Sequence, residues 1–164
     1  MNGCDEMVLT VRDVMVTPVI VVGSQQTAQH AAKVLSLNGI GCLVVVENEL
    51  VVGIITEKDL INRVIVEKRD PEETLVGDIM SKPPIVARPE LTLEDAIRVM
   101  FTHRIKKLIV VEGDGEKRRL AGLVTLTDIA RVNQSLMETL RRLFDDGGEA
   151  PPKSIEKTMS YYIV

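Results

Sequence analysis

Two stretches of the chain pair a threonine with an aspartate three residues later. The first reads Gly-Ile-Ile-Thr-Glu-Lys-Asp over residues 53–59, and the second reads Gly-Leu-Val-Thr-Leu-Thr-Asp over residues 122–128. In each stretch an apolar run typical of a strand ends at the threonine, and helical spacing of apolar residues follows the first. At such a junction the free backbone N–H groups and the helix dipole favour an anion. The aspartate is placed to accept hydrogen bonds from hydroxyls, such as those of a ribose.

The same pattern has a second interpretation, as an ordinary helix cap. A threonine followed three residues later by an acid forms a capping box, in which the acid reaches back to the N–H of the cap residue. One isolated copy favours capping alone. Two copies at equivalent places in a longer repeat give more weight to ligand binding, so both interpretations stay open at Asp59 and Asp128.

Composition excludes several classes of partner. The 164 residues are 45% hydrophobic, enough for one compact domain or two small repeats with a buried core. The net charge of −4 argues against nucleic acid as the main partner, because phosphate binding needs a basic face. Aromatic residues are limited to Phe101, Phe144, Tyr161 and Tyr162, so a bound purine is expected to lie between aliphatic side chains.

The cysteines and histidines show no pattern typical of a metal site or a disulfide framework. Cys4 and Cys42 are isolated, and His30 and His103 lie far apart in the sequence. No apolar run reaches the roughly 18 residues of a membrane span, and the N-terminus lacks the pattern of a signal peptide. We therefore expect a cytoplasmic protein with no bound metal and no membrane partner.

The chain contains an internal duplication. Residues 13–47 align without gaps to residues 78–112 at a shift of 65, and 13 of the 35 positions are identical; about two identities would be expected by chance. An insertion of four residues in the turn at 113–118 then changes the shift to 69. That new shift aligns the two Thr-x-x-Asp stretches with each other.

Each repeat is predicted to follow the order β-α-β-β-α. A short opening turn and a proline precede a brief strand, and a helix with one buried face comes next. A hairpin of two apolar strands follows, and a closing helix begins after the threonine. The predicted opening turns are 11–15 and 76–80, the brief strands 19–22 and 84–87, and the hairpins 43–47 with 51–55 and 108–112 with 120–124.

We assign the first repeat to residues 9–68, a polar linker to 69–75 and the second repeat to 76–134. One repeat of about 60 residues has a sheet too small to cover itself. The predicted fold class is therefore α/β (α+β), with the two repeats packed through their sheets about a pseudo-two-fold axis.

The remaining residues, 135–164, form a C-terminal helix extension and tail. The last helix is expected to run from about Leu126 to Phe144, with an apolar stripe that covers the protein's own core or a second subunit. The terminal Tyr-Tyr-Ile-Val is compatible with either a disordered end or a docked strand.

The repeat closely resembles the cystathionine β-synthase (CBS) domain, and residues 9–134 resemble a tandem CBS pair, or Bateman module. The first copy carries Asp-Val-Met, Pro-Val-Ile, Asn-Gly-Ile-Gly-Cys-Leu-Val-Val-Val and the stretch at 53–59. The second copy carries Asp-Ile-Met, Pro-Pro-Ile, His-Arg-Ile-Lys-Lys-Leu-Ile-Val-Val and the stretch at 122–128. Order, spacing and duplication all agree with the family pattern.

The resemblance implies a regulatory module rather than a catalyst. Such pairs bind adenosine-containing ligands, here AMP first, with ADP, ATP or S-adenosylmethionine as further possibilities, and they commonly form dimers. The family pattern also implies that each cleft is built from both repeats. The threonine and aspartate of one repeat then face the opening strand of the other.

Carried over residue by residue, the resemblance gives two unequal candidate sites. The first comprises Ile54, Thr56, Asp59, Pro84, Ile85, Ile105, Lys106 and Lys107. The second comprises Thr17, Val19, Ile40, Gly41, Cys42, Lys58, Leu123, Thr125 and Asp128.

In the first site Asp59 is expected to bind the ribose hydroxyls, while Thr56 and the two lysines meet the phosphate and the aliphatic residues hold the adenine. On charge pattern alone the lysines also fit a solvated strand end. In the second site Gly41 and Cys42 stand where the family often has a basic residue, and Lys58 only partly substitutes. We therefore expect a phosphorylated ligand in the first site. The second is expected to be weak, empty or suited to an uncharged adenosine group.

Two functions remain in competition. The first is a sensor of adenine nucleotides, in which binding changes the surface shown to a separate effector protein. The alternative is a structural dimerisation or protein-interaction module with degenerate clefts. An enzyme finds no support, because the sequence shows no nucleophile–base pair, paired acids or metal cluster.

Overall fold

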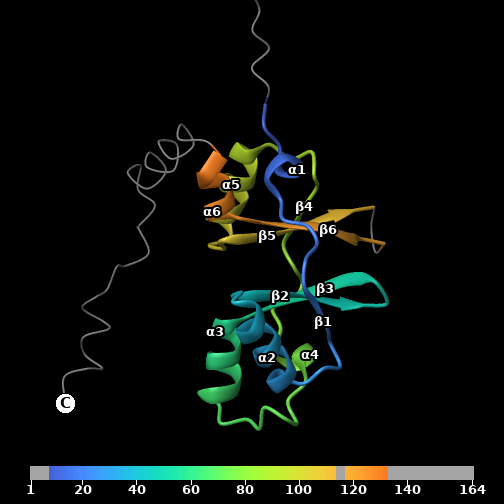
Figure 1. Ribbon diagram of the computed structural model, residues 1–164, viewed down its shortest axis with the longest axis vertical. Coiled ribbons are helices and arrows are strands. Elements are labelled where there is room, and N and C mark those ends of the chain that lie inside the picture. The colour runs from blue at the N-terminus through green and yellow to red at the C-terminus, as the bar shows by residue number, and fades with distance from the viewer. Residues whose placement is uncertain (1–7, 114–116, 133–164) are drawn as a thin grey trace, which may run out of the picture.

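The structure is a computed structural model that describes residues 8–113 and 117–132 (Figure 1). Two halves are stacked along the long axis, with their strands facing each other and their helices on the outer faces (Figure 1). In chain order the elements are α1 (Val11–Val14), β1 (Val21–Gly23), α2 (Ala28–Asn38), β2 (Cys42–Glu47), β3 (Leu50–Thr56), α3 (Glu57–Leu60), the π-helical turn η1 (Ile61–Ile65), α4 (Val76–Ile79), β4 (Val86–Ala87), α5 (Leu93–Thr102), β5 (Lys107–Glu112), β6 (Arg119–Thr125) and α6 (Leu126–Val132).

The two hairpins form as predicted. Strands β2 and β3 are antiparallel, and so are β5 and β6. In the first hairpin the turn residues Asn48 and Glu49 have φ angles of 47° and 65°, the left-handed conformation that a tight hairpin turn requires. The register pairs Cys42 with Thr56, so the start of β2 lies beside the threonine that ends β3. The second hairpin pairs Lys107 with Thr125 in the same way.

The brief strands β1 and β4 begin two residues later than the sequence pattern predicts. They pair in parallel with β2 and β5, starting at Val21 and Val86. Prolines at 18, 83 and 84 precede them. Because proline has no N–H to donate, the chain joins each ladder only beyond these residues.

The two halves pack through their sheets, as predicted. Buried Val44, Ile109 and Val111 form an apolar cluster between the hairpins. The sheets are also joined at one edge, where Leu50 of β3 pairs with Arg119 of β6. This single pairing gives one six-stranded sheet in the order β1-β2-β3-β6-β5-β4, a continuity that the sequence did not indicate.

Each opening turn packs on the opposite half, although the sequence assigns it to its own repeat (Figure 1). Val11 of α1 is buried in the core that contains α5 and β5, and its N–H donates to the carbonyl of Leu91 at 2.8 Å. Val76 and Ile79 of α4 are buried in the core that contains α2 and β2. The N–H of Val76 donates to the carbonyl of Gln26 at 2.8 Å. Neither repeat completes its core without the other.

The repeated glycine of the motif makes room for the exchanged turn. A β-carbon built on Gly53 would lie 2.6 Å from Sδ of Met80 and 3.0 Å from the carbonyl oxygen of Ser81. On Gly122 it would lie 2.7 Å from Sδ of Met15. Each glycine therefore receives the methionine that ends the opposite opening turn.

The segment predicted as a polar linker, 69–75, packs against the start of α2. The carbonyls of Pro71 and Thr74 accept hydrogen bonds from the N–H groups of Gln29 and Ala28, at 2.9 and 2.8 Å. These are donors of the first helical turn that have no partner inside the helix. The segment therefore caps α2 as well as joining the repeats.

Several predictions fall outside the described residues. They concern Cys4, Phe144, the helix beyond Val132, and the extension and tail at 135–164.

Candidate functional site

Both Thr-x-x-Asp pairs form complete capping boxes. Oδ2 of Asp59 accepts hydrogen bonds from the N–H and the hydroxyl of Thr56, at 2.9 and 2.6 Å. The N–H of Asp59 in turn donates to Oγ1 of Thr56 at 3.2 Å. The distances at Thr125 and Asp128 are the same. Capping therefore occupies one carboxylate oxygen, and any ligand would bind the other.

The second oxygen of Asp59 is also engaged. The hydroxyl of Ser81 donates to Oδ1 at 3.3 Å, and Nη1 of Arg63 lies 3.6 Å from the same oxygen. Nη1 of Arg63 also donates to the carbonyls of Ile79 and Met80, at 2.6 and 2.9 Å. Asp59 is thereby tied to the end of α4, and its side chain is only 12% exposed.

Asp128 has a different neighbourhood. The two shifts of the duplication place Val16 at the position of Ser81 and Val132 at the position of Arg63. The backbone pairing is preserved: Ile54 bridges to Ser81, and Leu123 bridges to Val16. Valine has no side-chain donor, and within 8–113 and 117–132 the hydrogen bonds recorded for Asp128 involve Thr125 alone. Among the described residues, Oδ1 of Asp128 therefore has no counterpart of the hydroxyl of Ser81 or the guanidinium of Arg63.

The two predicted phosphate lysines lie in different surroundings. Lys106 is exposed, and its carbonyl accepts from the N–H of Leu126 at 3.0 Å. Lys107 is half-buried and reaches across to Gly41 of the first repeat. A β-carbon built on Gly41 would lie 3.1 Å from Nζ of Lys107 and 3.4 Å from Oε2 of Glu57. The absence of a side chain at Gly41 thus leaves room for both charged groups.

This position of Lys107 supplies a cation that sequence reasoning expected to be missing beside Gly41 and Cys42. Burial raises the pKa of the Cys42 thiol, and the nearby charge and hydrogen bond of Lys107 offset part of that effect. Glu57 opposes Lys107 and raises the same pKa. Lys58, expected to substitute for the missing cation, is exposed on the first turn of α3.

The aliphatic candidates divide among three apolar clusters. Ile54, Leu123 and Val19 pack in the cluster between the hairpins. Ile85 and Ile105 pack against the core of the second half, and Ile40 packs against that of the first. Pro84 is half-buried just before β4, and Thr17 is exposed between α1 and β1. The structure brings Ile54 and Asp59 together with the segment that enters the second repeat, while Lys106 stays in solvent.

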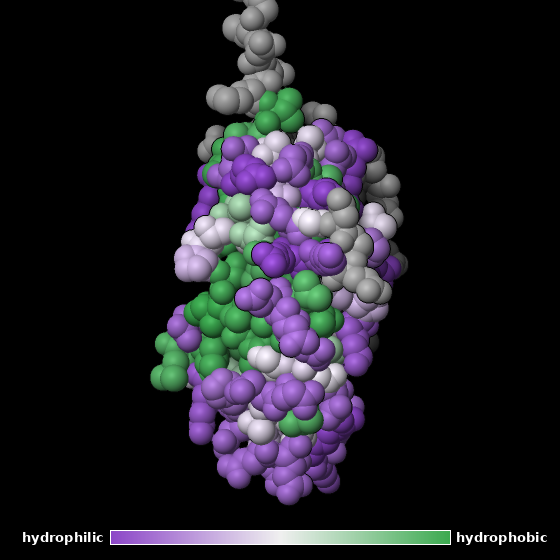
Figure 2. Space-filling model, turned by 90° about the vertical axis from the view of Figure 1, so that its right-hand side faces the viewer, coloured by the Kyte–Doolittle hydropathy of each residue, from purple (hydrophilic) through white to green (hydrophobic). Residues whose placement is uncertain are grey.

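Hydrophobic surface gathers where the two halves meet. Figure 2 shows a green area that crosses the middle of the molecule and ends before the polar lower end. Exposed apolar residues of the segment that crosses between the halves include Val16, Ile20 and Val21. This segment also carries Thr17 and Val19 of the second candidate site.

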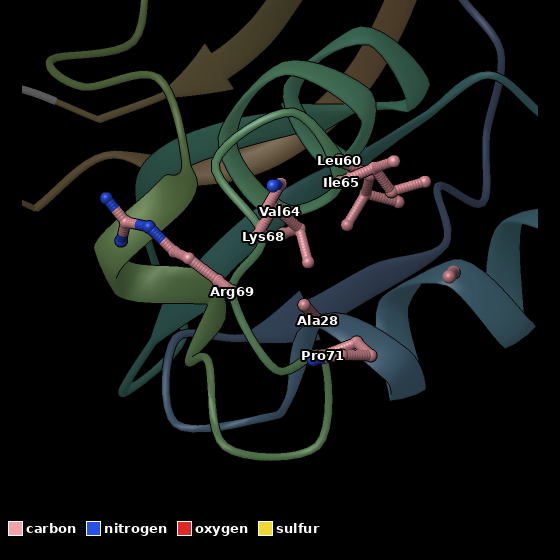
Figure 3. Close-up of a pocket in the computed structure, with 8 residues that line it drawn as sticks. Ala28, Leu60, Val64, Ile65, Lys68, Arg69 and Pro71 are labelled. Carbon is pink, nitrogen blue, oxygen red and sulfur yellow. The ribbon is translucent and has the colours of Figure 1, made fainter.

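A separate pocket of about 290 Å³ lies on the helical face of the first repeat. Figure 3 shows it between α2 and the closing helix, with Ala28, Val64 and Ile65 among its apolar lining residues and Arg69 extending away from them. Its polar lining residues are Lys68 and Arg69, and the lining includes none of the residues of the two candidate sites. We therefore do not identify this pocket with either candidate site.

Sequence reasoning missed three polar residues of the site: Glu57, Arg63 and Ser81. Arg63 lies one helical turn after Asp59, a spacing that brings side chains together on one helix face, and this signal was available. Ser81 and Glu57 carry no comparable signal. Ser81 reaches Asp59 because the segment that enters the second repeat crosses β3. Glu57 lies beside Lys107 because Gly41 has no side chain. Both are tertiary features.

Comparisons with known proteins agree with the duplication. The family model described as the CBS domain matches residues 11–66 and 76–135. The CBS domain-containing protein YhcV of Bacillus subtilis is 35% identical over 79% of this chain and 89% of its own length. A hexameric CBS-CP12 protein from bloom-forming cyanobacteria has a TM-score of 0.68 at 25% identity, with 88% of each chain covered.

Some curated relatives are longer than this chain. It spans 61% of an uncharacterized protein of Methanopyrus kandleri, at 34% identity over 74% of this chain. It spans 22% of the inosine-5'-monophosphate dehydrogenase of Korarchaeum cryptofilum, at 35% identity over 70% of this chain. The likeness to that enzyme is thus confined to one segment of it. Within the described part of the chain, every helix is too short or too polar to cross a membrane.

Proposed function

The chain belongs to the CBS-domain family, with two such domains in tandem, and from this premise we propose that it is a non-catalytic regulatory module that binds an adenine nucleotide. The ligand is AMP in the first instance, with ADP, ATP and S-adenosylmethionine as the other members of the class. It binds in the clefts between the two repeats and changes the surface offered to a separate effector protein in the cytoplasm. The module thereby reports the energy state of the cell.

The observation that carries the proposal is the placement of each Thr–Asp pair against the opposite repeat. Ile54, two residues before Thr56, pairs with Ser81, and Leu123, two residues before Thr125, pairs with Val16. A molecule at either aspartate therefore touches both repeats. Such a ligand shifts their relative arrangement by as much as its affinity differs between the two arrangements.

The charges near the aspartates suit a phosphorylated nucleoside. Lys107 pairs with Thr125 along the sheet, and its Nζ lies beside Gly41, whose carbonyl accepts a hydrogen bond from the N–H of Glu57, the residue after Thr56. A carboxylate for hydroxyls and an ammonium for phosphate are thus available together. The aliphatic residues Ile54, Leu123 and Val19 offer apolar surface for a purine without aromatic stacking.

Isothermal titration of ligand-free protein with AMP, ADP, ATP and S-adenosylmethionine tests this function. We expect micromolar binding of at least one of them, and loss of the heat in a variant that carries both Asp59→Ala and Asp128→Ala. Thermal unfolding gives an independent measurement, because ligand at 100 times its Kd stabilises the folded state by about 2.7 kcal/mol. Folded protein that binds none of the four contradicts the sensor function.

That result would favour the alternative, a dimerisation or protein-interaction module with degenerate clefts. One observation supports this alternative: Ser81 and Arg63 already hold the oxygen of Asp59 that a ribose would need. We further propose that the protein forms a homodimer through the exposed apolar residues of its closing helix, Ile61, Ile65 and Val66. They are 52%, 70% and 67% exposed, and large exposed apolar patches mark interaction surfaces.

A further inference from the structure

The two clefts differ in one respect that sets the order in which they fill. We propose that the cleft at Asp128 accepts the ribose hydroxyls of the ligand first, and that Arg63 and Ser81 form a latch that closes the cleft at Asp59. This inference rests on the proposed function. It reverses the order expected from the sequence, which placed the phosphorylated ligand at Asp59.

In the latch, the side chains of Ser81 and Arg63 occupy the carboxylate oxygen that the ribose hydroxyls of a ligand would otherwise contact. Two vicinal hydroxyls donate hydrogen bonds to a carboxylate, and the capping threonine already uses Oδ2 of each aspartate. At Asp59 the remaining Oδ1 receives the hydroxyl of Ser81 and the guanidinium of Arg63. A ribose must displace them there. Displacing the hydroxyl of Ser81 and the half-exposed guanidinium of Arg63 lowers affinity by about tenfold.

The second repeat allows a direct comparison, because it has the same backbone arrangement with different side chains. Its backbone crosses at the same place, since Val16 and Leu123 exchange hydrogen bonds of 2.8 and 3.2 Å, as Ser81 and Ile54 do at 2.8 and 3.1 Å. The side chains alone differ, and Val16 replaces the donor Ser81. A ligand reaches Oδ1 of Asp128 without breaking any contact recorded for that oxygen.

Release of the latch has a mechanical consequence. Besides Asp59, Arg63 holds the carbonyls of Ile79 and Met80, and both of these residues are buried in the core of the first repeat. A ligand that moves Arg63 away from Asp59 and from these two carbonyls therefore loosens the opening turn of the second repeat. Filling of the Asp128 cleft has no corresponding effect, because Val132 makes no such hydrogen bonds through its side chain.

The test begins with titration of AMP into two single variants. Asp128→Asn is expected to abolish the tighter binding event, and Asp59→Asn is expected to abolish the weaker one. Titration of 2',3'-dideoxyadenosine monophosphate, which lacks both hydroxyls, is expected to lose the same event. The reverse dependence, in which Asp59→Asn abolishes the tighter event, overturns the order of filling and leaves the proposed function intact.

A second pair of variants moves the latch between the repeats. Val16→Ser combined with Val132→Arg installs the donors beside Asp128, at positions that are 51% and 50% exposed and so tolerate the change. We expect this variant to weaken the tighter event by about tenfold or more. The control Val16→Ala with Val132→Leu adds no donor and is expected to keep the original affinity. Equal affinities in the two variants overturn the latch.

The complementary variant removes the original latch with the residues that the second repeat uses. Ser81→Val combined with Arg63→Val is expected to strengthen the weaker event about tenfold, and Ser81→Val alone serves if the double variant does not fold. If the affinity of the weaker AMP-binding event is unchanged in these variants, the proposal is wrong. If the original chain does not bind AMP, both the order of filling and the proposed function are wrong. If it binds AMP but Asp59→Asn abolishes the tighter event, only the order of filling is wrong.

Discussion

The carboxylates of Asp59 and Asp128 divide their two oxygens between different tasks. One oxygen of each closes a capping box with a threonine, and the other oxygen of Asp59 meets Ser81 of the opposite repeat. Capping and ligand binding are therefore compatible in the same residue. The second oxygen meets Ser81 and Arg63 in the first repeat, and the equivalent positions in the second repeat are Val16 and Val132.

At the same scale, the two motif glycines support a quantitative prediction. Gly53→Ala brings a β-carbon against Sδ of Met80 and also against the backbone oxygen of Ser81, which has little freedom to move. Gly122→Ala meets the side chain of Met15, which adapts by rotation. We expect Gly53→Ala to lower the free energy of unfolding by about 1–3 kcal/mol and Gly122→Ala to lower it by less.

Denaturant unfolding of the two variants measures this difference, with unchanged m-values as the check that the native fold is retained. Equal losses of stability, or a larger loss for Gly122→Ala, would contradict the argument.

The sequence was informative about these residues to different degrees. The Thr–Asp spacing predicted both boxes, because a capping box depends only on local geometry. The repetition of glycine and methionine was visible, but their contact was not, since it joins Gly53 to a turn that belongs to the other repeat. The position of the Lys107 side chain could not be predicted either, because it depends on the space that the missing side chain of Gly41 leaves.

At the scale of elements, the packing of each opening turn on the core of the other repeat was not predicted from the sequence. The strands of both hairpins were predicted to within one residue at each end, because their apolar pattern is local. The positions of α1 and α4 depend on which hydrophobic core each helix packs against. A short helix of four residues carries no sequence signal that identifies its partner.

The exchange predicts which half of the molecule a core substitution will loosen. Ile79→Ala removes a fully buried side chain from the first half, although residue 79 belongs to the second repeat by sequence. We expect a loss of about 2–5 kcal/mol, with amide hydrogen exchange accelerated in α2 and β2. Ile97→Ala in α5 is the matched control, since Ile97 is equally buried but lies in the core of the second half.

If Ile79→Ala instead accelerated exchange in α5 and β5 while α2 and β2 stayed protected, the assignment of α4 to the first core would be wrong.

At the scale of the whole molecule, the described surface is uneven. The outer helical face of the first repeat exposes Ile61, Ile65 and Val66 beside the apolar pocket of Figure 3, whose lining includes Leu60 and Val64. Burying one such side chain contributes about 1.5–3 kcal/mol. A second copy that covers this face would gain that stabilisation at several positions.

We therefore expect Ile65→Asp to weaken self-association by at least about tenfold, because it places a charge where an apolar side chain is buried between copies. Light scattering across a dilution series measures the change. Val8→Asp, at a residue that is 67% exposed near the start of the described chain, is the control and is expected to leave the dimer intact. A monomeric original chain, or an Ile65→Asp variant that dimerises normally, would contradict the proposed dimer face.

The exchanged turns also determine the order in which the two halves can fold during synthesis on the ribosome. The first half lacks Val76 and Ile79 until the linker has been synthesised, so its hairpin and α2 wait for the start of the next repeat. Val11 waits longer, because the core in which it is buried also contains Val124 and Ile129, near the end of the described residues. At about 5–20 residues per second, that delay is on the order of ten seconds. While residues 12–129 are being synthesised, α1 thus lacks the completed core on which it docks.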